Sequence, residues 1–90
     1  MAEGWTKDPG AKLDYHFDWK NWLEEGETIT TSTFDVTAGI TVESQEMVTT
    51  NTTVWLSGGR GGQNYQITNR IVTSAGRADE RSAILRVRDR

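Results

Sequence analysis

The sequence predicts a single all-β domain, an antiparallel sandwich of about seven strands with an N-terminal arm in front of it. A chain of 90 residues is too short to support two independent cores. Its hydrophobic content of 34% is low, which suits a thin sandwich with polar outer faces better than a helical bundle. Apolar and polar residues alternate along most of the chain, with turn residues about every 8 to 12 positions. We expect residues 1–12 to form the arm and residues 13–90 to form the sandwich.

The alternation places the strands of the first half in order. Residues 14–19 put Tyr15, Phe17 and Trp19 on one face. An acidic connector follows, in which residues 19–23 have the spacing of one helical turn. The next alternating runs are rich in threonine, isoleucine and valine, whose β-branched side chains favour pleated surfaces. These runs cover residues 28–36, 40–44 and 47–57.

The second half predicts a long strand and a closing hairpin. Residues 65–73 alternate along their whole length, and a turn at residues 74–79 follows them. The turn leads to a last strand, in which Ala83, Leu85 and Val87 line one face. This layout, with a tyrosine at the start of the long strand, resembles the last hairpin of bacterial and viral immunoglobulin-like modules. The resemblance implies an immunoglobulin-like sandwich in which Tyr65 makes a tyrosine-corner contact back to the loop before it.

Four tryptophans supply much of the apolar area. Trp19 and Trp55 lie in alternating strands, which favours packing in the core. Exposed tryptophans also stack on sugar rings, so a carbohydrate platform remains an alternative. Trp5 precedes any regular pattern, and we expect a partner subunit to bury it. The candidate core consists of Tyr15, Phe17, Trp19, Trp55, Tyr65, Ile67, Ile71, Leu85 and Val87.

A glycine-rich segment at residues 58–62 interrupts the alternation. A phosphate-binding loop would open a helix and carry a lysine, whereas this loop leads into a strand and contains no lysine. One Arg-Gly-Gly in an acidic chain also lacks the repetition of nucleic-acid-binding arrays. We expect a hairpin loop whose glycines adopt positive φ, with Arg60 at its tip as a candidate contact.

Charge is divided unevenly along the chain. Residues 1–46 carry ten acidic residues against three lysines, and residues 47–90 carry seven arginines against three acidic residues. Arginine is favoured in planar contacts to carboxylates. Two interpretations stay open: the arginines pair with acids of neighbouring strands, or they form a surface that docks on acidic partners. The candidate subunit-interface residues are Trp5, Arg60, Arg77, Arg88 and Arg90.

The sequence offers no constellation for catalysis or for a metal. Cysteine is absent, and His16 is the only histidine. Its neighbours Asp14 and Asp18 are expected to be solvated rather than to form a catalytic dyad. The acids of residues 24–27 lack the spacing of a calcium loop. We expect no enzyme, no cofactor and no metal, and neither a nucleic acid nor a membrane as partner.

The order and spacing of two sets of residues carry a wider resemblance. The first set is Lys7-Asp8-Pro9, Asp14-Tyr15, Asp18-Trp19, Trp22-Leu23, Gly26 and Thr28-Ile29. The second set is Val54-Trp55-Leu56-Ser57-Gly58-Gly59, Gly62, Tyr65, Ile67-Thr68-Asn69-Arg70-Ile71, Gly76-Arg77 and Arg81. Together they resemble a family of small structural proteins of tailed bacteriophages, described as fiber-tail adaptor or minor virion proteins. The resemblance covers nearly the whole chain from Lys7.

The resemblance implies an immunoglobulin-like domain built into the virion, with no catalytic residues to carry over. We expect a structural subunit that is made in the host cytoplasm and is present in many copies per particle. It would contact other head, neck or tail proteins, either as an adaptor for tail and fiber or as a head decoration. A carbohydrate- or host-surface-binding module of the same fold is the alternative.

Overall fold

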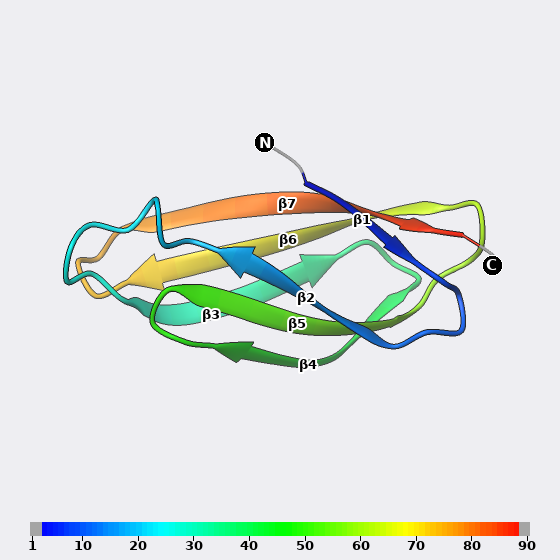
Figure 1. Cartoon of the computed structure of the whole chain (residues 1–90), viewed down its shortest axis with the longest axis horizontal. Helices are drawn as coiled ribbons and strands as arrows, with labels where there is room; N and C mark the ends of the chain where they lie inside the picture. Colours follow the sequence, from blue (N-terminus) through cyan, green and yellow to red (C-terminus); the bar gives the residue numbers. More distant parts are fainter. Residues whose placement is uncertain (1–2, 89–90) are drawn as a thin grey trace.

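The computed structural model describes residues 3–88, which form seven strands in two packed sheets (Figure 1). One sheet has the order β1-β7-β6-β3 and the other has the order β2-β5-β4. The prediction of an all-β sandwich with about seven strands is confirmed. The strands are β1 (Glu3–Lys7), β2 (Leu13–Asp18), β3 (Ile29–Val36), β4 (Ile40–Met47), β5 (Asn51–Gly58), β6 (Asn64–Thr73) and β7 (Ala78–Val87).

The connections between the strands are those of an immunoglobulin-like sandwich. Two hairpins, β4–β5 and β6–β7, each stay within one sheet, whereas the connections β1–β2, β2–β3, β3–β4 and β5–β6 cross between the sheets. At the start of β6, the Tyr65 hydroxyl accepts a hydrogen bond of 2.9 Å from the backbone N–H of Arg60. The predicted tyrosine-corner contact is therefore confirmed.

The first strand differs from the predicted arm. Glu3–Lys7 pairs in parallel with β7, from Ala83 to Val87. The Trp5 ring stacks on Tyr15 with a centroid distance of 4.6 Å, and it also contacts Phe17. This short segment has a single large apolar side chain, so its own pattern does not predict a strand. Its partners are supplied by the last strand of the chain, and the half-buried Trp5 ring packs against both core clusters of the sandwich.

The core consists of two adjoining clusters between the sheets. The first holds Ile40, Val54, Leu56, Tyr65, Ile67, Leu85 and Val87, and the second holds Phe17, Trp19, Ile29, Ile71 and Ala83. Tyr15 is half-buried and packs against the first cluster. Trp55 differs from the core prediction, because Thr52, Val54 and Leu56 occupy the inward positions of β5. Alternation then turns the Trp55 side chain to the outer face.

Asn69 lies at the centre of the buried face of β6 and makes four hydrogen bonds. Its side-chain oxygen accepts from the Trp19 indole N–H at 3.0 Å and from the Thr52 hydroxyl at 2.7 Å. Its side-chain nitrogen donates to the Ser32 hydroxyl at 2.9 Å and to the Thr33 carbonyl at 3.0 Å. These contacts, called the Asn69 network below, join both sheets. The amide has no remaining hydrogen-bonding capacity, so its burial is compensated.

The strand β4 also departs from the expected boundaries. The sequence predicts a break near residues 44–46, whereas β4 continues to Met47 and the turn falls at residues 48–50. A bulge between Val42 and Ser44 shifts the register against β5. Because a bulge disturbs the alternation of faces, the sequence pattern is interrupted where the strand continues.

The glycine-rich segment crosses from β5 in one sheet to β6 in the other, and so it is not the hairpin loop expected from the sequence. The backbone N–H of Gly62 donates to the Val87 carbonyl at 2.8 Å, which ties the loop to the end of β7. Gly59 has a φ of 93°, and a Cβ there would lie only 2.8 Å from the Val87 Cγ2 atom and 3.4 Å from the Tyr65 ring. Glycine is therefore required at residue 59 both by its backbone angle and by its close packing.

We expect Asn69→Leu to lower the free energy of unfolding by about 3 kcal/mol or more, because it leaves several buried polar groups without partners. Urea denaturation measures the loss. Thr33→Val, an exposed change on the neighbouring strand, is the control and should have little effect. Equal stabilities of the Asn69→Leu variant and the unsubstituted protein would show that the network does not hold the sheets together.

Gly59→Ala and Gly62→Ala separate backbone strain from packing. Both residues have positive φ, but a Cβ at Gly62 would meet nothing within 4 Å. We expect Gly62→Ala to cost about 1–2 kcal/mol from strain alone, and Gly59→Ala to cost about 1–3 kcal/mol more from overpacking. Thermal unfolding of the two variants compares them directly, and a similar loss in both would contradict the packing around Tyr65.

Candidate interaction surfaces

The arginines divide into those that the fold uses and those that it leaves exposed. Arg77 and Arg81 belong to the first group, since each guanidinium lies 4.2 Å from the centroid of a tryptophan ring. Arg77 covers Trp22, and Arg81 covers Trp19 and donates to the Asp18 carbonyl at 2.7 Å. Both arginines therefore make contacts within the chain, and the docking role expected for Arg77 stays a prediction.

Glu27 binds Arg77 across 50 positions of sequence. Its side chain is only 2% exposed, and it accepts hydrogen bonds from Arg77, from the Thr73 hydroxyl and from the Glu24 backbone N–H. The hydrogen bonds from Arg77, with those from Thr73 and Glu24, lower the pKa of Glu27 to about 2. This contact fastens the connection between β2 and β3 to the turn between β6 and β7.

Three arginines lie at the opposite end of the sandwich and are exposed: Arg60, Arg86 and Arg88. Backbone hydrogen bonds at Val87 place this group, because Val87 pairs with the loop that carries Arg60 and lies between the other two. We call these residues the arginine end. Arg60 and Arg88 were candidates from the sequence, Arg86 was not, and Arg90 lies outside the described residues.

Lys7 adds little exposed charge to this end, because its side chain is almost wholly buried. Its ammonium donates to the carbonyl oxygens of Asp8 at 2.7 Å and Pro9 at 3.4 Å. Desolvation lowers the pKa of Lys7, and the charge of Asp8 opposes that effect. Lys7 is therefore a buried residue at the end of β1 and is not part of the outer surface.

The outer face of the β2-β5-β4 sheet is acidic. Its register brings together four exposed carboxylates from two strands: Asp14 and Asp18 from β2, and Glu43 and Glu46 from β4. We call this surface the acidic face. His16 lies on it as well, with its Nε2 atom 3.2 Å from the Asp14 carboxylate and its Nδ1 atom 2.8 Å from the Thr53 hydroxyl.

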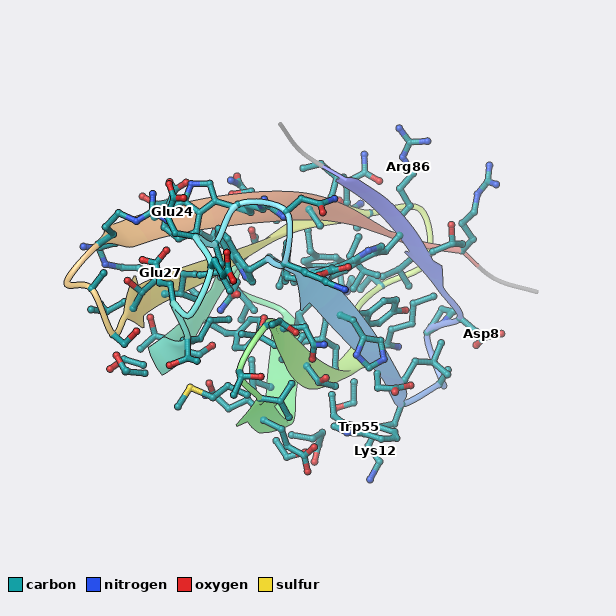
Figure 2. The ribbon with its side chains drawn as sticks, turned by 60° about the vertical axis from the view of Figure 1, so that its left-hand side comes forward. Asp8, Lys12, Glu24, Glu27, Trp55 and Arg86 are labelled. Atoms are coloured by element: carbon teal, nitrogen blue, oxygen red, sulfur yellow. The ribbon has the colours of Figure 1, made fainter. Side chains whose placement is uncertain are left out.

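Trp55 stands in the middle of the acidic face, with Asp14 directly opposite on β2 and Ser44 opposite on β4. The half-buried indole lines a shallow hollow of about 250 Å³ together with Lys12, Glu43 and Ser44. Figure 2 shows Trp55 and Arg86 on opposite sides of the sandwich, with Lys12 next to Trp55. The two charged surfaces therefore point in different directions.

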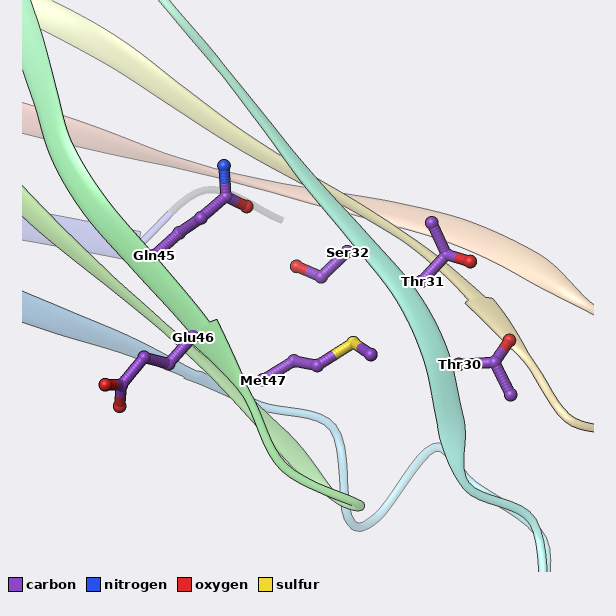
Figure 3. A pocket seen from close by; sticks show the side chains of 6 residues that line it. All are labelled: Thr30, Thr31, Ser32, Gln45, Glu46 and Met47. Carbon is purple, nitrogen blue, oxygen red and sulfur yellow. The ribbon is translucent and has the colours of Figure 1, made fainter.

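A second hollow, of about 310 Å³, lies between the edge strands β3 and β4 (Figure 3). Met47 and Gln45 extend into it and Ser32 faces them, whereas the Glu46 carboxylate points away. Ser32 already accepts a hydrogen bond from Asn69. The lining is mostly hydroxyl, amide and thioether, so this hollow has no convergent acid and base that could carry out catalysis.

The described part of the chain contains no group of three histidine, aspartate or glutamate residues placed to hold a metal ion. Within residues 3–88, no helix is long and apolar enough to cross a membrane.

Glu27→Gln tests the buried ion pair through the pH dependence of stability. The unfolded state binds protons as the pH falls below about 4.5, while Glu27 in the folded state stays ionised until the pH approaches about 2. The ion pair therefore stabilises the fold at neutral pH, and this contribution is lost as the pH falls through that window. We expect urea midpoints of Glu27→Gln to be lower at neutral pH and to change less on acidification. The exposed neighbour change Glu25→Gln is the control, and parallel pH curves for Glu27→Gln and the unsubstituted protein would contradict the account.

Comparison with known proteins identifies a family for this chain. A family model described as "Podophage GP4 fiber-tail adaptor protein gp77" matches residues 7–86, which is most of the chain. No curated protein matches the chain. The matched segment begins at the end of β1 and extends almost to the end of β7, so it covers β2 to β6, most of β7 and the acidic face. Of the arginine end it includes Arg60 and Arg86 but not Arg88. The chain therefore belongs to the podophage fiber-tail adaptor family gp77.

Proposed function

We propose that this protein is a virion subunit that joins two other virion proteins, as an attachment between tail and fiber rather than as a head decoration. The proposal assigns one partner to the arginine end and another to a different surface of the sandwich. An adaptor needs two separate surfaces, and this chain carries two of opposite charge that point in different directions. The family description supports a place at the tail.

The proposal rests on the division of the arginines into those with internal contacts and those that are exposed. Arg77 and Arg81 are held by Glu27, Trp22 and Trp19, whereas the three arginines at the other end are exposed. An arginine left in solvent at the end of a rigid fold is free to make planar contacts with carboxylates. We infer that the arginine end binds an acidic surface of one partner.

The edges of the sheets are poor candidates for these contacts. The four edge strands are β1, β2, β3 and β4. Both β3 and β4 contain a bulge, β1 has only five residues, and β2 has six residues that include Asp14 and Asp18. Bulges, charges and short length protect an edge against pairing with another strand. Contacts through ends and faces are therefore favoured over the addition of a strand from a partner.

The carbohydrate-binding alternative loses most of its basis in the described residues. A sugar platform needs flat, exposed aromatic rings. Trp5 is stacked on Tyr15, and Trp19 and Trp22 are covered by arginines. Only Trp55 offers an uncovered ring among the described aromatic residues that the sequence proposed for sugar binding.

We expect Arg60→Ala combined with Arg88→Ala to reduce retention of this subunit in purified particles by about tenfold, since each exposed ion pair contributes up to about 1 kcal/mol. Retention should also fall as salt rises, because exposed charges are screened over about 10 Å at 0.1 M ionic strength. Quantitative mass spectrometry of washed particles measures both effects.

Arg70→Ala is the matched control, because Arg70 is exposed on the outer face of β6, away from the arginine end. It should leave retention unchanged. Equal losses in the control and in the double variant, or no loss in either, would contradict an arginine contact at this end.

A further inference from the structure

Trp55 is the one tryptophan whose ring has neither an aromatic nor a guanidinium neighbour within the described part of the chain. The fold covers Trp19 and Trp22 with arginines at 4.2 Å, and it stacks Trp5 on Tyr15. The half-buried Trp55 indole is a large apolar group on a sheet face whose other outward side chains are mostly polar or charged. Its ring is free to receive a group that this chain does not supply.

The surroundings of Trp55 define the charge of that group. Asp14 lies directly opposite on β2, and Glu43 lines the same hollow from the bulge of β4. Glu43 also accepts a hydrogen bond of 2.6 Å from Ser57, which holds its carboxylate beside the outer face of β5. An indole ring attracts a cation above its plane, and carboxylates at its edge accept hydrogen bonds from the same cation.

The rest of the face is mostly negative. Asp18 and Glu46 extend the negative charge toward the β4–β5 turn, while Lys12 contributes a positive charge at the rim of the hollow. In Figure 2 the Lys12 side chain extends outward beyond the indole. An approaching nucleic acid would meet like charge here, whereas an arginine- or lysine-bearing protein segment would meet complementary charge.

We propose that the acidic face docks a cationic segment of another virion protein, with an arginine or lysine side chain of that partner seated over the Trp55 ring between Asp14 and Glu43. This inference rests on the proposed function and names the chemistry of the second partner of the adaptor. The carboxylates alone do not define the site. The uncovered indole in a hollow at their centre does.

The test uses particles assembled with substituted full-length chains. Trp55→Ala removes the ring, and Asp14→Asn combined with Glu43→Gln removes two charges while keeping the side-chain shapes. We expect each to lower the amount of this subunit in purified particles by about tenfold. Thermal unfolding of the isolated protein should be unchanged in the charge variant and lower in Trp55→Ala, which removes a half-buried ring, but both variants should stay folded at the temperature of the assay. The matched control is Asp35→Asn combined with Glu80→Gln, which removes two exposed charges from the opposite sheet.

The outcomes separate this inference from the function on which it rests. If the unsubstituted chain is absent from particles, the proposed function fails and this inference fails with it. If the chain is present but its retention ignores both acidic-face variants, or falls equally in the control, only the inference is overturned.

Two further measurements test whether the acidic face binds something other than a cationic protein segment. Self-association of the purified chain that Trp55→Ala abolishes would assign the face to a second copy. A change in tryptophan fluorescence on titration with host polysaccharide, lost in Trp55→Ala, would assign it to a sugar. Either result overturns a cationic partner.

Discussion

The four hydrogen bonds of Asn69 fix how the two sheets of this sandwich face each other. A buried amide is costly unless each of its donors and acceptors has a partner, and the observed arrangement of β3, β5 and β6 supplies all of them. Thr52, one of its partners, sets the inward positions of β5, and Trp55 consequently faces outward three residues later. Trp19, another partner, is held where Arg81 covers it. The network thus connects the core to the chemistry of the surface.

Internal pairing decides which charges remain for partners. The buried Glu27 carboxylate forms an ion pair with Arg77. At the same end of the molecule, the guanidinium groups of Arg77 and Arg81 each lie over a tryptophan ring. The exposed charges include a group of arginines at the other end and a group of carboxylates on one face. Acidic residues from the first half of the sequence form one surface, and arginines from the second half form another. The connections that cross between the sheets place these two surfaces apart. For a rigid structural subunit, such surfaces determine orientation and partner choice more than they determine stability.

Much of the fold is readable from the alternation of side chains, and the exceptions have physical causes. Residues 65–73 show their buried face directly, and the tyrosine corner follows from Tyr65 at the start of that strand. The strand β1 is not readable, because its stability comes from pairing with β7 and from a ring stacked 10 positions away. In β5 both faces contain apolar residues, so the sequence does not reveal that Val54 is inside and Trp55 outside. The ion pair of Glu27 joins segments too distant in sequence for any local pattern to connect them.

We infer that one small sandwich joins two virion proteins through surfaces of opposite charge. Electron cryomicroscopy of the intact particle, at a resolution that places side chains of this subunit and its neighbours, can test this inference. We expect two different neighbouring proteins, one with carboxylates against the arginine end and one with a cationic side chain over Trp55. A subunit whose arginine end and acidic face both point into solvent, or both contact only copies of this chain, would contradict it.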